Sequence, residues 1–227
     1  MKRPNDYIED LLVRIAHHST AIEGNTLTQG ETKSILIDQY IPRPMSMNEL
    51  YEVQNYRQFM IYLLDSYTKP ITPQTIKDIH KLLTEHLVTT PGKYKTIRNI
   101  VIGADFTPVE PYEVPLAIQR WCDDLAYRLA FNRTLEDKVL TIMEQHLKFE
   151  HIHPFSDGNG RTGRALIVYA CLNQGIEPII IEKEQRKDYI NLLNTEDIKG
   201  LQAIGVKLVT KEEGRRKIFI DRENKSL

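Results

Sequence analysis

The amino-acid sequence predicts an all-α protein, a mainly helical bundle with one small β-hairpin. Apolar residues recur at intervals of three and four in several segments, which is the spacing of an amphipathic helix. Residues 162–174 are apolar on almost every side, so we expect that helix in the middle of the bundle. Only one patch is rich in β-forming residues, and glycines and prolines bound it.

Several amphipathic helices follow from this spacing. Their marker residues are, in chain order, Val53, Tyr56, Met60 and Leu63; Ile76, Ile79, Leu83 and Leu87; Ile118, Cys122, Leu125 and Leu129; and Val139, Met143, His146 and Glu150. Thr72-Pro73 opens the second of these helices, because proline fits a first helical turn. The stretch from Lys207 onward mixes both signs of charge and is expected to be a solvated tail or a peripheral helix. With no internal repeat or long linker, residues 1–227 are expected to form a single domain.

The β-rich patch lies within residues 92–108. Its members are Ile97, Ile100, Val101, Ile102 and Phe106, and Pro91-Gly92 comes before them. An exposed strand edge there could bind an extended segment of another protein by adding it as a further strand. The alternative is a connecting hairpin with no partner.

Composition places the chain among ordinary globular proteins, with 41% hydrophobic and 27% charged residues. A net charge of −1 gives no electrostatic reason to expect nucleic acid or an anionic membrane as a partner. The longest apolar stretch, Ala165 to Leu172, is too short to span a bilayer, and no apolar signal region follows the first residues. Cys122 and Cys171 fall in helical patterns and are expected to be buried thiols. The expected location is therefore the cytoplasm.

The most informative stretch runs from His153 to Arg164. His153 precedes Pro154, which disfavours the α conformation, so the preceding helix is expected to stop near His151 and leave His153 in a loop. Histidine can accept a proton near neutral pH, which makes His153 a candidate general base. Phe155 is expected to anchor the loop in the core.

The second half of this stretch favours an anion. Gly158-Asn159-Gly160 can turn successive N–H groups toward one point at the start of a helix. Arg161 and Arg164 share a face of that helix, and like charges so placed are unfavourable unless an anion lies between them. These features together indicate a phosphate cradle.

Asp157 adds a carboxylate beside the cradle, which suits a Mg²⁺ ion bridging phosphate oxygens. Each feature also has an ordinary structural explanation: a helix N-cap for Asp157, a structural histidine at His153 and a solvated face for the arginines. Because all of them fall within the twelve residues from His153 to Arg164, a nucleotide-phosphate site is favoured over those explanations.

The stretch resembles the signature of the Fic/Doc family, His-x-Phe-x-Asp/Glu-Gly-Asn-Gly-Arg-x-x-Arg, and matches it at every specified position. The resemblance implies a Fic-type helical bundle and a protein adenylyltransferase. Such an enzyme moves AMP from ATP to a hydroxyl side chain of a target protein and releases pyrophosphate. Glycine at the Gly158 position favours AMP transfer over the phosphate transfer of Doc-like kinases.

The resemblance also implies roles for the matching residues. His153 would deprotonate the target hydroxyl, and Asp157 would hold Mg²⁺. Asn159, with the N–H groups of the glycines on either side, would bind the phosphates of ATP. Arg161 and Arg164 would reach the β- and γ-phosphates.

A second resemblance lies in the N-terminal segment, residues 1–27, where Ser-Thr-Ala-Ile-Glu-Gly matches the Ser/Thr-x-x-x-Glu-Gly/Asn inhibitory motif of the family. Ser19 and Glu23 lie on one helix face, and Gly24 is a natural helix stop. The match implies membership of the class whose inhibitory helix precedes the core. In that class the glutamate pairs with the arginine at the Arg164 position and keeps ATP out of its productive pose. The alternative is an ordinary helix end with a surface glutamate.

Two further segments resemble the family. Residues 92–108 look like its flap, a β-hairpin beside the active site. The flap residues expected to position the target chain are Val101, Ile102 and Gly103. The segment around Tyr189 resembles one that contributes to the adenine pocket, and Asn194 fits that pocket only if a gap is allowed.

Other functions stay open at this point. His151, His153 and Asp157 could ligate Zn²⁺ or Mn²⁺ in a metal-dependent hydrolase, although the glycines and paired arginines would then lack a purpose. The chain could instead sense ATP without turning it over. Glu23 could also position a water that removes AMP from a modified target, as in some relatives. Because some relatives use dimerisation as a switch, a homodimer is a further partner to consider.

Overall fold

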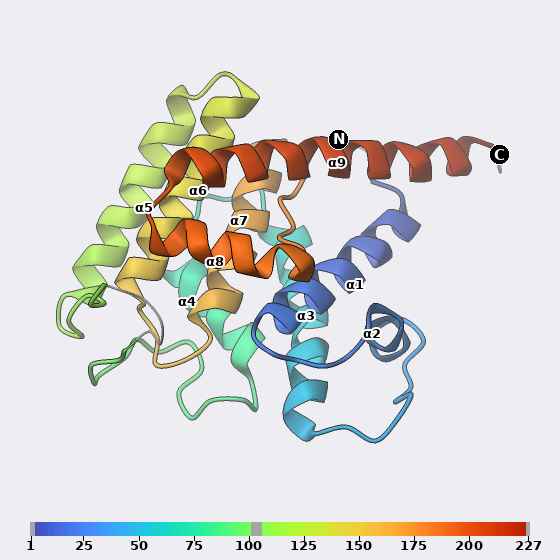
Figure 1. Ribbon diagram of the computed structural model, residues 1–227, viewed down its shortest axis with the longest axis horizontal. Helices are drawn as coiled ribbons and strands as arrows, with labels where there is room; N and C mark the ends of the chain where they lie inside the picture. Colours follow the sequence, from blue (N-terminus) through green and yellow to red (C-terminus); the bar gives the residue numbers. More distant parts are fainter. Residues whose placement is uncertain (1–2, 101–105, 226–227) are drawn as a thin grey trace.

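The computed structural model describes residues 3–100 and 106–225, and helices dominate them. They are, in chain order, α1 (Asn5–Ile22), α2 (Gln29–Leu36), α3 (Met47–Ser66), α4 (Pro73–Thr84), α5 (Val114–Phe131), α6 (Leu135–Ile152), α7 (Asn159–Asn173), the 3-10 helix η1 (Lys183–Gln185), α8 (Arg186–Asn194) and α9 (Ile198–Lys225). Figure 1 shows them as a helical bundle. The prediction of a mainly helical fold is confirmed.

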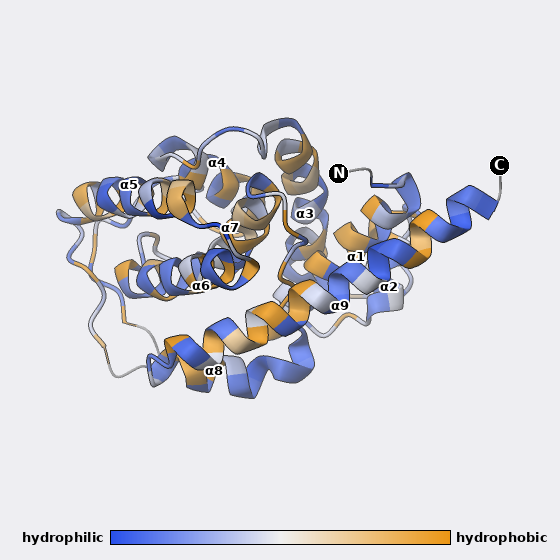
Figure 2. Ribbon diagram, turned by 90° about the horizontal axis from the view of Figure 1, so that it is seen from above, coloured by the Kyte–Doolittle hydropathy of each residue, from blue (hydrophilic) through white to orange (hydrophobic). Residues whose placement is uncertain are grey.

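Helix α7 lies in the middle of this bundle, as its apolar sequence predicts. It packs against α1, α4 and α6, and every residue from Arg161 to Leu172 is buried. Helix α6 in turn packs between α5 and α9 (Figures 1 and 2). The loop that joins α6 to α7 is therefore mounted on two core helices.

Local sequence sets the starts of several helices. The hydroxyls of Thr28, Ser46 and Thr72 each accept a hydrogen bond from a backbone N–H in the first turn of α2, α3 and α4. Pro73 is the first residue of α4, which confirms the start predicted from Thr72-Pro73. Helix α4 matters for function because it carries one support of the candidate site.

The predicted β-hairpin is not confirmed. Within the described residues of the segment, 92–100 and 106–108, no strand forms. Ile97 and Ile100 are exposed, with 78% and 88% of their surface accessible. Val101, Ile102 and Gly103 lie outside the described residues, so the flap assignment stays a prediction.

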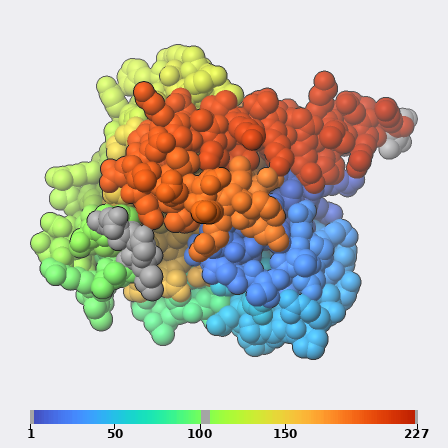
Figure 3. Space-filling model, viewed as in Figure 1, coloured from blue at the N-terminus to red at the C-terminus, as the bar shows by residue number. Residues whose placement is uncertain are grey.

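The stretch from Lys207 onward is the second half of α9, so the expectation of a peripheral helix is confirmed. On its inner face, the side chains of Leu208 and Val209 are buried. Glu212 on the same face accepts two hydrogen bonds from Arg14 of α1, at 2.6 and 2.7 Å. Helices α8 and α9 cover one face of the molecule, and the end of α9 extends past the bundle (Figures 1 and 3).

Two expectations from composition can be checked on the described residues. Cys122 and Cys171 are free and buried, as predicted. None of the helices formed by residues 3–100 and 106–225 is long and apolar enough to cross a membrane.

Candidate active site

His153 is the residue that ends α6. The helix stops at Ile152, one residue later than predicted, and His153 takes the left-handed conformation with φ 47° and ψ 61°. This conformation is unfavourable for a side chain with a Cβ, and Pro154 excludes the ordinary helical alternative. His153 Nδ1 lies 3.2 Å from the carbonyl oxygen of Glu150. With Nδ1–H donating to that carbonyl, Nε2 keeps a free lone pair.

The His153 imidazole is held in its neutral form. Burial lowers its pKa to about 4, and the nearby Lys95 ammonium acts in the same direction, while the carbonyl of Glu150 opposes both. A neutral imidazole is the form that can accept a proton at pH 7. The geometry therefore suits a general base at Nε2.

The loop after His153 is anchored by Phe155, as predicted. Phe155 is fully buried and stacks on His80 of α4, with ring centroids 3.6 Å apart and an interplanar angle of 6°. His80 Nδ1 accepts a hydrogen bond from Gly92 N–H at 2.9 Å, so its Nε2–H donates to the carbonyl of Asp157, also at 2.9 Å. Burial lowers the pKa of His80 to about 4, which keeps this ring neutral and the two bonds intact.

The Asn159 side chain closes the same loop from the other end. Its Oδ1 accepts from Phe155 N–H at 2.9 Å and its Nδ2 donates to Phe155 C=O at 2.8 Å. A further support comes from the first part of the predicted flap, where Lys95 N–H donates to Pro154 C=O and Asn99 Nδ2 donates to Phe155 C=O, both at 2.8 Å. Because the Asn159 amide is held by these two bonds, its backbone N–H at the start of α7 is the donor placed to meet an anion.

Glycine is required at Gly158 of the cradle, and Gly160 leaves room for the Glu23 carboxylate. Gly158 has φ 78°, and a Cβ there would lie 2.5 Å from Cγ2 of Thr84. At Gly160 a Cβ would lie 2.5 Å from Oε1 of Glu23. The N-terminus of α7 is thus bare of side chains on the side where its free N–H groups can bind an anion.

Arg161 projects from this N-terminus with unused donors. Its side chain is 6% exposed, and the nearest carboxylates are Glu52, 3.5 Å from Nη1, and Asp157, 3.8 Å from Nη2. Among the described residues, Nε and Nη1 have no hydrogen-bond partner. The two carboxylates balance part of its charge but leave these buried donors without hydrogen bonds, so an anion that supplies acceptors there is favoured.

Arg164 is satisfied instead, and α1 supplies its partners. Nε donates to Ser19 Oγ at 2.9 Å, and Nη2 donates to Ser19 C=O at 3.0 Å and to Glu23 Oε1 at 2.5 Å. Ser19 Oγ also accepts from Tyr56 O–H of α3 at 2.6 Å. The residues of the predicted inhibitory motif therefore meet the last arginine of the catalytic motif.

Glu23 reaches Arg164 because α1 ends there. Gly24 has φ 106°, its N–H bonds Ala21 C=O, and the next N–H bonds Thr20 C=O, which is the hydrogen-bond pattern of a glycine stop. Burial pushes the pKa of Glu23 up, but the charge and hydrogen bond of Arg164 outweigh it and hold that pKa below its usual range. Glu23 is therefore ionised at pH 7.

Residues 70–171 match the model of the Fic/DOC family, and this span contains the whole loop described above. The chain carries a Fic/DOC domain.

Relatives of this Fic domain extend the match beyond that span. The chain is 32% identical over 179 residues to "Protein adenylyltransferase Fic" of Drosophila willistoni, which covers 78% of this chain and 35% of the relative. Against the protein of the same name from Aedes aegypti it is 30% identical over 197 residues, covering 84% of this chain and 39% of the relative. The chain thus spans little more than a third of the length of these curated relatives.

Solved structures show the same fold. Fic-1 from C. elegans matches with a TM-score of 0.75 and 27% identity, covering 98% of this chain and 65% of that one. A Fic domain containing signaling protein from Bacteroides thetaiotaomicron matches with a TM-score of 0.80 and 22% identity, covering 90% of this chain and 84% of that one. The second likeness concerns the fold alone.

Asp157 is the candidate Mg²⁺ ligand of the Fic loop. Its side chain is 69% exposed, and Oδ1 accepts from Gly158 N–H at 2.5 Å. One carboxylate at the edge of a phosphate cradle fits Mg²⁺, which takes its other ligands from phosphates and water. No group of three His, Cys, Asp or Glu side chains in the described part of the chain could hold a metal by itself.

His151 does not join His153 and Asp157 in a ligand cluster. Its ring stacks on Phe106, with centroids 4.1 Å apart, and its Nε2 lies 3.9 Å from Glu196. The geometry of the described side chains therefore gives no support to the metal-dependent hydrolase considered from the sequence.

The two residues predicted for the adenine pocket, Tyr189 and Asn194, both lie on α8, but one is buried and the other is exposed. Tyr189 is 1% exposed; its hydroxyl lies 2.6 Å from His146 Nε2, and the two rings are stacked. Asn194 is exposed at the last position of α8. Arg186 at the start of α8 donates to Ile22 C=O at 2.7 Å and so joins this helix to the end of α1. The adenine assignment stays a prediction.

Sequence reasoning missed the supports of the Fic loop. His80, Lys95 and Asn99 hold its backbone. His80 belongs to no motif, and Lys95 and Asn99 lie in the segment that resembles the flap, which does not by itself indicate contact with the loop. The only signal for His80 was a polar residue on the apolar face of α4, which also marks an ordinary core histidine. A separate hollow of about 840 Å³ lies between α2, α3 and α4, and its lining includes no residue of the loop.

Proposed function

We propose that this chain transfers AMP from ATP to a hydroxyl side chain of a target protein, and that Glu23 restrains the reaction. The observation that carries the proposal is that one loop holds both a neutral His153 and, at the N-terminus of α7, a buried Arg161 with unused hydrogen-bond donors. The curated relatives named protein adenylyltransferase Fic support it. ATP is the co-substrate of such a reaction.

In the proposed reaction His153 is the general base. Nε2 takes the proton of the target hydroxyl as that oxygen forms a bond to the α-phosphorus of ATP. The bond from the α-phosphorus to the oxygen shared with the β-phosphate breaks, and pyrophosphate leaves. Most of the rate comes from positioning and charge stabilisation, as is usual for transfers at phosphorus.

The phosphates are held by the cradle in this proposal. The N–H groups of Asn159 and Gly160 and the guanidinium of Arg161 bind the oxygens, and the Gly158 N–H joins them once it leaves Asp157 Oδ1. Arg164 binds the γ-phosphate when Glu23 is displaced. Asp157 holds Mg²⁺, which when bound neutralises phosphate charge. Tyr189 and Asn194 contribute to the adenine side, and the protein acts in the cytoplasm.

Glu23 restrains the reaction because it occupies the place of a phosphate group. Its carboxylate takes the Nη2 donor of Arg164 at 2.5 Å, so a γ-phosphate and Glu23 compete for one guanidinium. It also fills the space beside Gly160, where a phosphate oxygen would approach the cradle. Bound ATP is then held in a pose that does not present its α-phosphorus to the target.

The target protein docks on the flap, residues 92–108, through Val101, Ile102 and Gly103. The exposed side chains of Ile97 and Ile100 support an apolar docking surface at this place. An extended target segment adding to the flap would bring its hydroxyl toward His153.

The test is the transfer of α-labelled ATP, with Mg²⁺, to the protein itself and to a cell lysate. Wild type, Glu23→Gly and the double variant Glu23→Gly/His153→Ala are compared. We expect label mainly with Glu23→Gly and none with the double variant. Nucleotide binding by the double variant, measured by calorimetry, should stay within about threefold of Glu23→Gly, because a general base acts in the transition state.

Absence of label in every variant, despite measurable ATP binding, would contradict AMP transfer. It would favour an ATP-sensing regulator or an enzyme that removes AMP from a modified target. A second check uses Arg164→Ala combined with Glu23→Gly. Unchanged turnover in that variant would remove the γ-phosphate role of Arg164.

A further inference from the structure

Three polar residues lie in the last turns of α6 and just after it, where the chain approaches the candidate site. His146 and Glu150 are four residues apart and share a face of α6, and His153 follows directly after the last residue of that helix. Glu150 stands between the two histidines: Oε2 lies 4.0 Å from His153 Nδ1, and Oε1 lies 3.9 Å from His146 Nε2. The Glu150 side chain is 14% exposed.

The Glu150 carboxyl has no partner that explains its burial. Oε1 is shielded from solvent and has no hydrogen-bond partner among the described residues. His146 Nε2 is already engaged by the hydroxyl of Tyr189 at 2.6 Å. An unsatisfied buried carboxyl destabilises a fold, so packing alone gives no reason for it.

The neighbouring helix leaves room for this carboxyl. Gly163 of α7 faces it, and a Cβ at Gly163 would lie 2.5 Å from Glu150 Oε1 and 2.9 Å from His146 Cε1. The same glycine stands between Arg161 and Arg164, within the cradle helix. The core is therefore shaped around an acidic side chain placed directly behind the candidate base.

The titratable and charged groups around the pair come from several helices. Those near Glu150 are Arg164 from α7, Glu23 from α1, Tyr189 from α8 and His146 from its own helix. The groups that face His153 are Lys95 from the predicted flap, Asp157 from the loop and Glu23.

Burial dominates at both members of the pair. It raises the pKa of Glu150 to about 7, with Arg164 opposing and Glu23 adding to the rise. It lowers the pKa of His153 to about 4. An imidazole with so low a pKa is a weak base, and a carboxylate beside it would strengthen it.

We propose that Glu150 is a positioning residue for His153: its carboxylate takes the Nδ1–H of the imidazole and balances the charge that forms when Nε2 accepts the proton of the target hydroxyl. The proton from the hydroxyl stays on Nε2, and the Nδ1 proton stays on the ring, so no further proton acceptor is needed. In the structure Nδ1 uses the Glu150 backbone carbonyl at 3.2 Å, and the carboxylate lies 4.0 Å away, within reach of a small rotation.

For the reaction step this inference rests on the proposed function. The contact itself does not, because Glu150 acts on the titration of His153 with or without ATP. The two ideas can therefore fail separately.

The kinetic test uses Glu150→Gln in the Glu23→Gly background, with α-labelled ATP and the maximal transfer rate measured from pH 5.5 to 8.5. We expect a rate about 10–100-fold lower at pH 8, a KM for ATP within about twofold, and loss of the rise in rate near pH 7. The matched control is Glu144→Gln, on the same helix but paired with Arg128 and Lys148 at the surface. It should leave the rate and the pH profile unchanged.

The second test needs no activity. The imidazole Cε1–H signal of His153 is followed by NMR against pH in the ATP-free protein and assigned by its absence in His153→Ala. With Glu150 present, we expect a titration in two steps, because the two sites are coupled. With Glu150→Gln, it should become a single step at lower pH.

Each outcome bears on one idea. An inactive Glu23→Gly protein contradicts the proposed function, while the NMR titration still tests Glu150. Unchanged rate and unchanged His153 titration in Glu150→Gln overturn the inference. If Glu150→Gln does not fold, Glu150→Asp replaces it: a lower rate with the pH-dependent rise retained supports the inference, and a parental rate with a flat pH profile overturns it.

Discussion

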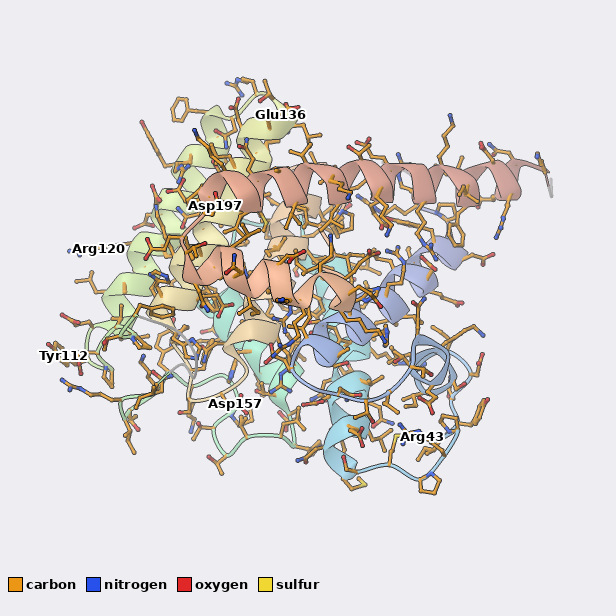
Figure 4. All side chains as sticks on the ribbon, in the orientation of Figure 1. Arg43, Tyr112, Arg120, Glu136, Asp157 and Asp197 are labelled. Carbon is orange, nitrogen blue, oxygen red and sulfur yellow. The ribbon has the colours of Figure 1, made fainter. Side chains whose placement is uncertain are left out.

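The candidate catalytic loop, residues 153–160, and the end of α1, residues 19–24, both contact α7, the helix that carries Arg161 and Arg164, but they are held in different ways. The loop is held through its backbone by side chains from α4, from the segment at 95–99 and from α7. The end of α1 reaches the site mainly by side chain, and Glu23 is 39% exposed. We therefore expect that removal of the Glu23 side chain leaves the hydrogen bonds that hold the loop intact. Figure 4 labels Asp157 on that loop.

The largest expected effect comes from breaking the loop. Asn159→Ala removes both side-chain bonds to Phe155 and leaves a buried N–H unsatisfied. In the Glu23→Gly background we expect about 100-fold less transfer, since displacement of the base by about 1 Å has this effect. The free energy of unfolding should fall by about 1–3 kcal/mol, measured by urea denaturation.

Asn132→Ala is the control for that variant. Asn132 also makes two side-chain hydrogen bonds, to Asp137 C=O and Thr141 Oγ1, but it lies between α5 and α6, away from the loop. Asn132→Ala should lower the free energy of unfolding but leave the transfer rate of the folded protein unchanged. Full transfer by Asn159→Ala would show that the loop does not need this support.

Removal of the Glu23 restraint should raise the transfer rate. Glu23→Ala frees Arg164 for the γ-phosphate, and we expect transfer to rise about 5–150-fold, the usual range for coupling between two sites. Glu9→Ala, an exposed glutamate on the same helix, serves as the control and should change nothing. A fall in transfer with Glu23→Ala would mean that Glu23 belongs to the machinery.

Ser19→Ala should show a smaller gain and a clearer loss of stability. Ser19 Oγ accepts from Arg164 and from Tyr56 O–H, but Glu23 and the Ser19 carbonyl still hold Arg164 after the change. We expect transfer to rise by less than about fivefold and the free energy of unfolding to fall by about 1–3 kcal/mol, because Tyr56 O–H is left buried without an acceptor. A gain equal to that of Glu23→Ala would make the hydroxyl the main restraint.

The smallest effect separates the two regions by pH. The pKa of His80 is lowered to about 4, so its contribution to stability is complete above about pH 6.5 and is lost as pH falls toward 4. The pKa of Glu23 is also lowered, and its contribution is lost only below the usual carboxyl range. Acidification from pH 7 therefore weakens the support of the loop before it weakens the restraint.

For His80 alone, we expect a loss of about 1 kcal/mol in the free energy of unfolding between pH 6.5 and 5.5. The measurement is urea denaturation of wild type and His80→Gln at both pH values. The difference between their pH slopes isolates His80 from the other buried histidines. Equal slopes would mean that His80 titrates in the folded protein as it does in the unfolded chain.

Sequence spacing was sufficient for much of the fold. The apolar period placed α3 to α6, and Thr72-Pro73 placed the start of α4, because both depend on neighbours within one or two helical turns. The period ran too far in α4, which ends at Thr84, so that Leu87 lies in the turn beyond it. The β-hairpin is not confirmed, since its described residues form no strand. Strand pairing depends on partners brought together by the fold, which local composition does not specify.

The sequence by itself determined the chemical groups of the candidate site, which are the candidate base His153, the cradle from Gly158 to Gly160 and the two arginines. These residues lie within twelve positions of the chain, so they stay close together once the loop and the first turns of α7 form. Only the tertiary structure decided that Arg164 is satisfied by Ser19 and Glu23 while Arg161 is not, and that Glu150 lies behind His153. These facts depend on helices far apart in the chain packing side by side. Burial there sets which donors are used and which groups carry charge.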